Sequence, residues 1–446
     1  MTKHIAVIGA GWAGLAAAAT LAERGVPVTV FEASRSLGGR ARRVSIDGVD
    51  LDNGQHVLIG AYRETLRLMR LVGADPEKLL LRLPLELRFA DGFHLRAPRL
   101  PYPFNLLVAL LGATGVDLAQ SFSALRFMAA LRACNFRIEP DRSVAQVLDE
   151  HRQTGALRTH LWGPLCVSAL NTPVDRASAQ VFAKVLRDGL TGTRDASDLL
   201  IARTDLGRLF PEPAAKYVKA HGGRIELGVP VRAIGKDSGG FRLDDRPERY
   251  TTLIVACAPQ HAAPLLAGFA ELTATRAMIE RLDYEPIVTC YLQYPESVSL
   301  PAPMLGFNGG IVQWAFDRGG LGGPKGLLAA VISASGAHEE LAKEELASRV
   351  GIELKAALGE FPSPRWTQVI TERRATFSCV PALARPEVQT VVPGLTLAGD
   401  YVASEYPGTL EAAVRSGIAA AKAVEERITS ELSREARTAS STGVIG

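Results

Sequence analysis

The pattern of apolar and polar positions is clearest at the start of the chain. A run of four apolar residues, Ile5–Ile8, predicts a buried strand, and the alanine-rich segment Leu15–Arg24 predicts a helix after it. Gly25 ends that helix, and the apolar run Val28–Phe31 predicts a second strand. A strand, a helix and a strand in this order are typical of a βαβ unit, so the chain begins as an α/β protein.

The pattern changes in the first half of the remaining chain. Residues 71 to about 200 are mostly helical in periodicity, with a proline-rich turn over Pro98–Pro103. Apolar runs then predict strands at 224–227, 230–234 and 252–259. These strands return to the α/β character of the N-terminus.

Short alternating apolar runs follow between Gln260 and about Ser378 and predict an antiparallel sheet. An amphipathic helix is predicted over Glu339–Leu358, and the glycine-rich stretch Gly319–Gly326 is a predicted loop because it lacks the Lys-Ser/Thr pair of a phosphate loop. After Gly394 the pattern is strand, loop and helix. The small polar residues at the end of the chain predict a disordered tail.

Three glycines with the spacing G-x-G-x-x-G stand between the first strand and the first helix. In dinucleotide-binding units Gly9 allows the tight turn, Gly11 lets the backbone approach a pyrophosphate, and Gly14 lets the helix pack closely on the strand. The N-terminus of the helix would face the phosphates with unpaired N–H groups. Glu32, at the end of the second strand, is placed to accept a hydrogen bond from a ribose hydroxyl, and its charge disfavours the 2′-phosphate of NADP.

The residues after this acid distinguish between dinucleotides. Gly38, Gly39 and Arg40 resemble the extension found in the amine oxidase and carotenoid desaturase superfamily of flavoproteins, where they pass along the FAD diphosphate and the flavin. Paired glycines permit close backbone approach, and the guanidinium offers a fork of donors to anionic oxygens. The alternative interpretation is a basic surface turn.

Three later segments resemble the same superfamily. The segment around Gly54, Gln55 and His56 resembles its D-x-G-x-H stretch, and Val231 occupies the position of a valine that meets the adenine through its backbone. Near the C-terminus, a Gly-Asp pair implies contact with the ribityl chain or diphosphate, and the helix after it aims its N-terminus at the flavin. The cofactor residues that the resemblance implies are Gly9, Gly11, Trp12, Ala13, Gly14, Glu32, Gly38, Gly39, Arg40, Gly54, Gln55, His56, Val231, Gly399, Asp400, Gly408, Thr409 and Leu410.

The resemblance implies a Rossmann-type FAD-binding domain interleaved with an α+β substrate domain, in the α/β class. The FAD-binding domain is expected at 1–70, 201–260 and 386–428, the substrate domain at 71–200 and 261–385, and the disordered tail at 429–446.

A narrower resemblance rests on short motifs. The segments Gly11–Leu15, Asp52–His56, Leu161–Leu165 with Asn171–Pro173, and Ala398–Tyr401 are similar to the squalene-associated FAD-dependent desaturases, also called hydroxysqualene dehydroxylases. That family implies reductive removal of the hydroxyl of hydroxysqualene, giving squalene for hopanoid synthesis. Alternatives are a carotenoid or phytoene-type desaturase, an amine oxidase, or a non-enzymatic lipid-binding scaffold on the same fold. The low aromatic content, 6%, provides little for an aromatic cage around an amine.

The sequence offers few candidate catalytic residues besides those expected to bind the cofactor. No cysteine pair or metal-ligand spacing stands out, so the flavin N5 is the expected reactive centre. Removing a hydroxyl needs an acid, and Glu405 and Tyr406 are the nearest candidates to the predicted flavin-facing residues. Trp162 and Asn171 either line a substrate channel or are a buried tryptophan and a turn asparagine. The sequence does not indicate the electron donor.

Charge and hydropathy limit partners and location. The net charge of +3 without a lysine-rich block does not suggest nucleic acid. The chain begins at once with a strand, five scattered cysteines suit a reducing compartment, and no apolar stretch reaches the roughly eighteen residues that span a bilayer. A cytoplasmic protein is expected. The basic-then-apolar order of residues 96–111 suits either a peripheral membrane contact that admits an apolar isoprenoid or a core helix.

Overall fold

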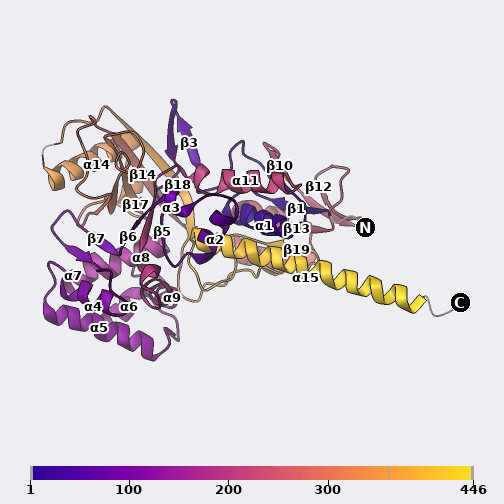
Figure 1. Cartoon of the computed structure of the whole chain (residues 1–446), viewed down its shortest axis with the longest axis horizontal. Helices are drawn as coiled ribbons and strands as arrows, with labels where there is room; N and C mark the ends of the chain where they lie inside the picture. Colours follow the sequence, from indigo (N-terminus) through magenta and orange to yellow (C-terminus); the bar gives the residue numbers. More distant parts are fainter. Residues whose placement is uncertain (1–3, 360, 443–446) are drawn as a thin grey trace.

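The structure, a computed structural model, describes residues 4–359 and 361–442. Figure 1 shows two lobes: one is built on a parallel sheet that lies beside the N-terminus, and the other combines an antiparallel sheet with a group of helices. The chain passes between the lobes several times, so each lobe is assembled from separate segments. The predicted fold class, a Rossmann-type domain interleaved with an α+β domain, is confirmed.

The parallel sheet has the strand order β10-β2-β1-β13-β19. Its strands are β1 (Ile5–Ile8), β2 (Val28–Glu32), β10 (Arg224–Leu227), β13 (Thr252–Val255) and β19 (Leu395–Leu397). Ile5 is in register with Val28 on one side and with Thr252 on the other. Strands β1 and β13 are apolar or small at every position and fully buried, as expected for a sheet covered on both faces.

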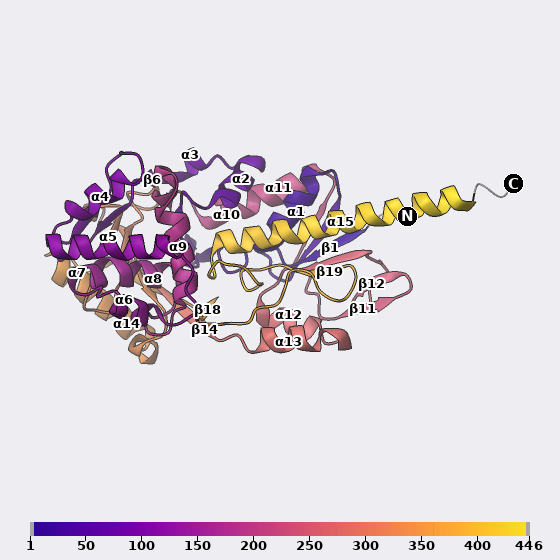
Figure 2. The same ribbon diagram turned by 90° about the horizontal axis from the view of Figure 1, so that it is seen from below.

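Helices α1 (Trp12–Glu23), α11 (Pro211–Ala220) and α15 (Leu410–Thr442) cover one face of this sheet. Helices α1 and α15 approach each other unusually closely, because a Cβ atom on Gly417 would lie 2.1 Å from the carbonyl oxygen of Ala13. The glycine and the alanines of α1 therefore permit this packing. In Figure 2, α15 runs along the lobe and then projects beyond it.

The second lobe contains a five-stranded antiparallel sheet of order β15-β16-β17-β14-β18. Its strands are β14 (Tyr284–Gln293), β15 (Met304–Gly306), β16 (Trp314–Asp317), β17 (Leu327–Ser333) and β18 (Trp366–Phe377), and helix α14 (Lys343–Leu358) packs against β14 and β18. This confirms the antiparallel sheet predicted from the alternating apolar runs. The glycine-rich stretch is the loop between β16 and β17, as predicted.

Helices form the outer part of the second lobe (Figures 1 and 2). They are α4 (Phe104–Leu111), α5 (Leu118–Ala133), α6 (Val144–Glu150), α7 (Gly155–Leu157), a π-helical turn (Arg158–Trp162), α8 (Gly163–Leu170) and α9 (Ala179–Leu190). Near the boundary of the lobes lie α2 (Arg63–Leu71), α3 (Pro76–Leu79), α10 (Leu206–Leu209) and a 3₁₀ turn (Arg194–Ser197), and beside the parallel sheet lie α12 (Pro259–Leu265) and α13 (Thr273–Glu280). Within the described residues, no helix has both the length and the apolar character required to cross a bilayer.

Small sheets and hairpins connect these parts. β5 (Val57–Ile59), β9 (Leu199–Ala202) and β6 (Leu80–Leu83) form one antiparallel sheet. The hairpins are β3 (Arg43–Ile46) with β4 (Val49–Asp52), β7 (Glu86–Arg88) with β8 (His94–Arg96), and β11 (Ile234–Asp237) with β12 (Gly240–Leu243).

Residues 71 to about 200 are mostly helical, as predicted, but they also contain β6, β7 and β8, because these segments pair with distant or adjacent strands that periodicity alone does not reveal. Two predictions of local structure are wrong. No strand forms over 230–233, because Pro230 has no N–H, and the N–H groups of Arg232 and Ala233 donate to the side chain of Asp244 instead of to a neighbouring strand.

The second wrong prediction concerns the tail expected to be disordered from residue 429. Helix α15 continues to Thr442, and residues 429–442 contain no glycine or proline that would interrupt it. The last part of the predicted tail, 443–446, lies outside the described residues.

Candidate functional site

The glycine-rich turn lies where the order of the parallel sheet reverses. Strand β1 stands between β2 and β13, and its carboxyl end runs into Gly9, which has a φ of +109°. A Cβ atom on Gly9 would lie 2.8 Å from the carbonyl oxygen of Ala256, just beyond β13. In open α/β sheets, ligands bind at this switch point, outside the carboxyl ends of the strands.

The other two glycines of the motif differ in their surroundings. A Cβ atom on Gly14 would lie 1.9 Å from the carbonyl oxygen of Gly9, so α1 packs against the turn only because residue 14 has no side chain. Around Gly11 the backbone is open, and the nearest atom to an added Cβ is the Cα of Gly39 at 3.8 Å. Gly11 is the N-cap of α1, with no side-chain hydrogen bond and no acid in the first turn, so the positive end of the helix is free to meet an anion.

Glu32 is fixed beside this turn by two backbone donors. Its carboxylate accepts the N–H of Ala10 at 2.7 Å and the N–H of Ser34 at 2.8 Å. A carboxylate has about four acceptor positions, so two are left for a further donor such as a ribose hydroxyl. The Glu32 carbonyl also accepts the N–H of Val229 at 2.9 Å, which brings the loop that contains Val231 next to the acid.

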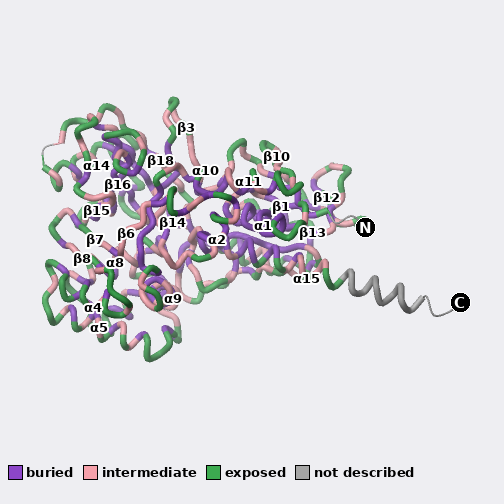
Figure 3. The backbone as a smooth tube through the Cα atoms, viewed as in Figure 1, coloured by how far each residue is buried: buried purple, intermediate pink, exposed green. Residues whose placement is uncertain are grey.

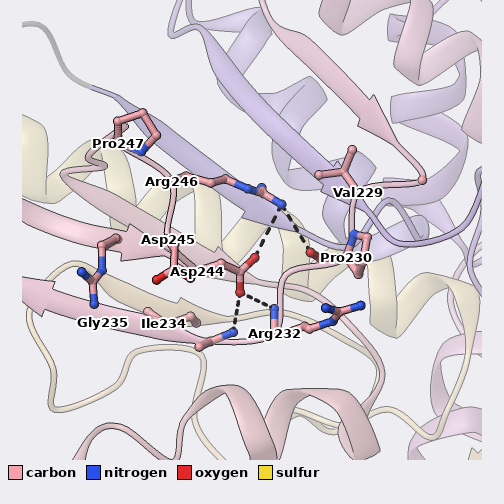
Figure 4. A pocket seen from close by; sticks show the side chains of 12 residues that line it. Val229, Pro230, Arg232, Ile234, Gly235, Asp244, Asp245, Arg246 and Pro247 are labelled. Carbon is pink, nitrogen blue, oxygen red and sulfur yellow. Dashed lines mark hydrogen bonds and ion pairs between the residues drawn. The ribbon is translucent and has the colours of Figure 1, made fainter.

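An open hollow of about 920 Å³ borders this loop (Figure 4). Pro230 and Arg232, the neighbours of Val231, line it. The Asp244 carboxylate accepts the N–H groups of Arg232 and Ala233 at 2.8 and 2.9 Å and thereby fixes the loop conformation. The backbone of Val231 is thus held in place close to Glu32.

Arg40 and Asp400 connect the N-terminal and C-terminal parts of the site. The guanidinium forms an ion pair with the buried Asp400 carboxylate and also donates to the Ala375 carbonyl at 2.9 Å. Burial alone would lower the pKa of Arg40, but the Asp400 carboxylate together with Glu372 and Tyr284 outweighs burial and raises that pKa above its ordinary value. Arg40 therefore stays charged beside the glycine pair, with 28% of its side chain accessible.

The segment before β5 is held by both lobes. Asn53 donates to the Arg40 carbonyl at 3.0 Å, and Gln55 donates to the Tyr291 hydroxyl of β14 at 2.8 Å. Burial lowers the pKa of His56, although the Gly54 carbonyl, 3.3 Å from its Nδ1, opposes the shift, so its imidazole is neutral at pH 7. His56 is half-buried.

The C-terminal block completes this group. Gly399 has a φ of +154°, and its N–H donates to Ser416 at 2.8 Å. A Cβ atom on Gly408 would lie 3.3 Å from an Asp400 carboxylate oxygen. The Thr409 hydroxyl accepts the N–H of Ala412 at 3.2 Å in the first turn of α15, which begins at Leu410. The start of α15 is therefore next to the Arg40–Asp400 pair.

Trp12 and Ala13 are packing residues. Trp12 is buried, donates to the Ala41 carbonyl at 3.0 Å and lies against the ring of Phe210 at 5.0 Å. Ala13 presents its backbone to Gly417. Trp12 and Ala13 therefore hold the start of α1 against Ala41, Phe210 and α15.

Sequence reasoning missed two buried hydroxyl groups in this region. Neither the Oγ1 of Thr289 nor the hydroxyl of Tyr401 has a hydrogen-bond partner among the described residues. The Thr289 hydroxyl lies 4.0 Å from the position of a Cβ on Gly54, and the Tyr401 ring lies against Gly399. Buried hydroxyls are almost always paired, so both are evidence of a group bound between these segments. Tyr401 follows the Gly-Asp pair directly and was thus detectable, whereas nothing in the pattern marks Thr289.

The two candidate acids lie in the loop between β19 and α15. Glu405 is 67% exposed and pairs with Lys184 at 2.7 Å and with Arg187 at 3.4 Å, both on α9. The Tyr406 hydroxyl donates to Asp188, also on α9, at 2.8 Å. Burial raises the pKa of Tyr406, so this phenol keeps its proton. Both residues attach the loop to the second lobe.

The two other residues that the sequence singled out have partners in the core. The indole of Trp162 is buried and donates to Gln153 at 2.9 Å. Asn171, in the left-handed conformation at the end of α8, donates to Thr376 at 3.0 Å and accepts the N–H of Ala334 at 2.8 Å. These contacts agree with the interpretation of Trp162 as a buried tryptophan and of Asn171 as a turn asparagine. No group of three or more His, Cys, Asp or Glu side chains suited to a metal ion occurs in the described part of the chain.

Comparison with known proteins shows what this chain is similar to. Residues 12–425 match the model of the family described as flavin containing amine oxidoreductase. A hydroxysqualene dehydroxylase of Rhodopseudomonas palustris is 30% identical over 446 residues, covering 95% of this chain and 99% of the relative. A zeta-carotene desaturase of Zea mays is 24% identical and covers 93% of this chain and 82% of the relative. Among solved structures, a putative protoporphyrinogen oxidase from Exiguobacterium superposes with a TM-score of 0.69 at 18% identity, covering 95% and 99% of the two chains.

Proposed function

Because this chain belongs to the flavin containing amine oxidoreductase family, we propose that it is an FAD-dependent hydroxysqualene dehydroxylase, which reduces hydroxysqualene to squalene in hopanoid or squalene biosynthesis. The observation that carries this proposal is the 30% identity with the Rhodopseudomonas palustris enzyme over nearly the whole of both chains. The carotene desaturase has lower identity and leaves more of its own length unmatched, so desaturation is the weaker alternative.

FAD fits the residues of the switch point. In this proposal the open backbone at Gly11 and the start of α1 receive the diphosphate, and Glu32 accepts from the adenosine ribose. The backbone of Val231 meets the adenine. Arg40 and Asp400 lie at the diphosphate and ribityl chain, and the two unpaired hydroxyls of Thr289 and Tyr401 gain a polar neighbour.

The remaining residues of the proposed site surround the flavin. They are Gly38, Gly39, Gly54, Gln55, His56, Gly399, Gly408, Thr409 and Leu410, with Trp12, Ala13, Gly9 and Gly14 shaping the turn. The neutral imidazole of His56 adds no charge there, and the start of α15 presents its positive end.

The proposed reaction replaces a C–O bond by a C–H bond. FAD held by these residues would, once reduced by an external two-electron donor, supply the hydride. The protein has to deliver a proton to the hydroxyl, so that the oxygen leaves with its bonding electron pair as water and the carbon can accept hydride. A dry, apolar surrounding and the absence of a strong nucleophile protect the cationic carbon between the two events.

Glu405 and Tyr406 are the proposed proton donors, because they lie just before the residues proposed to face the flavin. Burial raises the pKa of Tyr406, so the phenol keeps its proton at neutral pH, and its hydroxyl donates to Asp188 at 2.8 Å. Glu405 is more exposed, and its carboxylate forms ion pairs with Lys184 and Arg187 of α9.

We also propose that the enzyme acts in the cytoplasm, at the inner face of the membrane. A C30 isoprenoid is almost insoluble in water and partitions into lipid, so the protein must collect it there. A peripheral contact meets this need without a membrane-spanning helix.

An anaerobic assay tests the reaction. Enzyme loaded with FAD and reduced beforehand is mixed with hydroxysqualene, while flavin absorbance and squalene mass are followed together. We expect flavin oxidation and squalene formation in equal amounts. Flavin that stays reduced, combined with oxidised enzyme that introduces double bonds into an isoprenoid, would establish the desaturase function instead.

A further inference from the structure

Exposed apolar side chains gather in one part of the second lobe. The large apolar residues with exposed side chains here are Leu100, Phe104, Val108, Leu111, Leu118 and Phe122, with exposed fractions from 40% to 63%. We call these six residues the α4–α5 apolar face. Elsewhere in the described chain, the large exposed apolar residues Leu227, Met278, Ile352 and Val391 are scattered. A concentration of this kind on a folded protein marks an interaction surface.

Helix geometry explains how α4 presents this face. Phe104, Val108 and Leu111 follow the spacing i, i+4, i+7 and therefore lie along one side of the helix. The opposite side, with Ala109 and Leu110, is buried in the lobe. Helix α4 thus has apolar residues both on its buried side and on its exposed side. A helix at a surface in contact only with water usually has polar residues on its exposed side.

Helix α5 continues the same character. It packs against α4, and the Ser121 hydroxyl donates to the Leu110 carbonyl at 2.9 Å. Leu118 and Phe122, one turn apart, are among the most exposed of the six, at 63% and 58%. In Figure 2 the two helices lie at the end of the molecule opposite the projecting part of α15, and Figure 3 shows exposed positions along both.

The charges within the segment that forms this face, residues 96–135, have almost one sign, although Glu86 of β7 lies 3.8 Å from Arg96. Between residues 96 and 135 the chain carries four arginines, Arg96, Arg99, Arg126 and Arg132, and a single acid, Asp117. All four arginines are exposed. Asp117 is engaged as the N-cap of α5, where it accepts the N–H of Gln120 at 2.7 Å. Helix α4 carries no charged side chain, so an apolar centre is bordered by positive charge.

We propose that the α4–α5 apolar face inserts into the surface of a bilayer that contains anionic phospholipid, with the surrounding arginines on the lipid headgroups. Apolar side chains with a basic border are what an interfacial membrane contact requires. The exposed residues of α4 offer no polar side chain to a partner protein, whereas protein–protein interfaces typically contain several hydrogen bonds. The inference rests on the proposed function only for its purpose, which is collection of an apolar substrate.

Sedimentation with vesicles tests the contact without substrate. The FAD-loaded full-length protein is mixed with vesicles of phosphatidylcholine alone or of phosphatidylcholine with phosphatidylglycerol. We expect binding to the mixed vesicles that weakens as salt is added. The double variant F104D/F122D should bind at least about tenfold more weakly. The matched control is I352D/V391D, which removes two equally exposed apolar residues elsewhere and should bind like the parent.

Two further measurements, the melting temperature and the sedimentation coefficient, make the outcome decisive. Melting temperatures must agree between F104D/F122D and the parent, because a large loss would show that these side chains belong to the core and overturn the proposal. Equal binding of both double variants would also overturn it. A sedimentation coefficient that falls in F104D/F122D, with no vesicle binding by the parent, would identify a second copy of the chain as the occupant.

Dehydroxylation of hydroxysqualene dispersed in detergent separates this inference from the proposed function. F104D/F122D should retain parental activity there, because its proposed defect concerns access from lipid. If the parent binds vesicles but has no activity in detergent, the proposed reaction fails and the membrane contact stands.

Discussion

Arg40 and Asp400 lie 360 positions apart in the chain and form an ion pair in which the carboxylate is almost completely buried. Arg40 follows the glycine pair after β2, and Asp400 follows β19 at the far edge of the parallel sheet. The pair therefore connects the first and the last segment of the nucleotide-binding lobe. The same guanidinium reaches the Ala375 carbonyl of β18, so the antiparallel sheet is tied to this point as well.

The variant D400N should lose both stability and FAD. It leaves a guanidinium without its counter-charge, and breaking a largely buried ion pair costs about 3 kcal/mol of unfolding free energy. Urea unfolding and the ratio of flavin to protein absorbance measure the two effects. The control is E345Q, which removes an exposed pair with Arg349 and should change stability by less than about 0.5 kcal/mol. Equal stability of the two variants would refute the role of the pair.

The variant E32A should retain less FAD than the parent. Glu32 accepts the N–H of Ala10 in the glycine-rich turn and, in the proposed complex, a ribose hydroxyl. Each charge-assisted hydrogen bond contributes about 1.5 to 3 kcal/mol, so the dissociation constant for FAD should rise by at least about tenfold. Titration of the apoprotein with FAD measures it. A protein as yellow as the parent, with unchanged affinity, would exclude this role.

The carboxyl of Asp52 should make stability depend on pH. Burial raises its pKa from 3.8 to about 6, although the Leu206 N–H and Arg318 oppose the shift. Between the two values the folded state binds more protons than the unfolded state, so the contribution of Asp52 to stability falls as the pH rises through this window. From about pH 5 to about pH 8 the loss is about 1 to 1.5 kcal/mol.

The variant D52N removes this titration and keeps an oxygen acceptor for the Leu206 N–H. The difference in unfolding free energy between parent and D52N should therefore change by that amount between the two pH values, in favour of the parent at the lower pH. Parallel changes in the two proteins would show that another group is responsible.

The proposed proton donors differ in their expected mutant kinetics. If Tyr406 delivers the proton, Y406F should lower kcat by about a hundredfold, whereas E405Q should lower it by less than about threefold. E405Q also loosens the contacts to Lys184 and Arg187, so melting temperatures of both variants serve as controls. The reverse order of kcat values would assign the proton to Glu405.

The sequence by itself determined the nucleotide-binding half of the fold. Gly9 and Gly14 are local requirements of a turn and of a helix packed on it, and Glu32 stands at a fixed distance along the chain from both. Such features are visible because their causes lie within about thirty residues. The buried strands were equally visible, because a strand covered on both faces is apolar at every position.

Only the tertiary structure decided what depends on distant parts of the chain. The strands within residues 80–96 were missed because their pairing partners are not marked by local periodicity, and the hydroxyl of Thr289 gains significance only because β14 comes close to Gly54. Whether residues 96–111 were core or surface was undecidable from an apolar run, since burial depends on what packs against each side. The fold buries one side of α4 and leaves Phe104 and Val108 exposed, and that outcome belongs to the packing of the whole lobe.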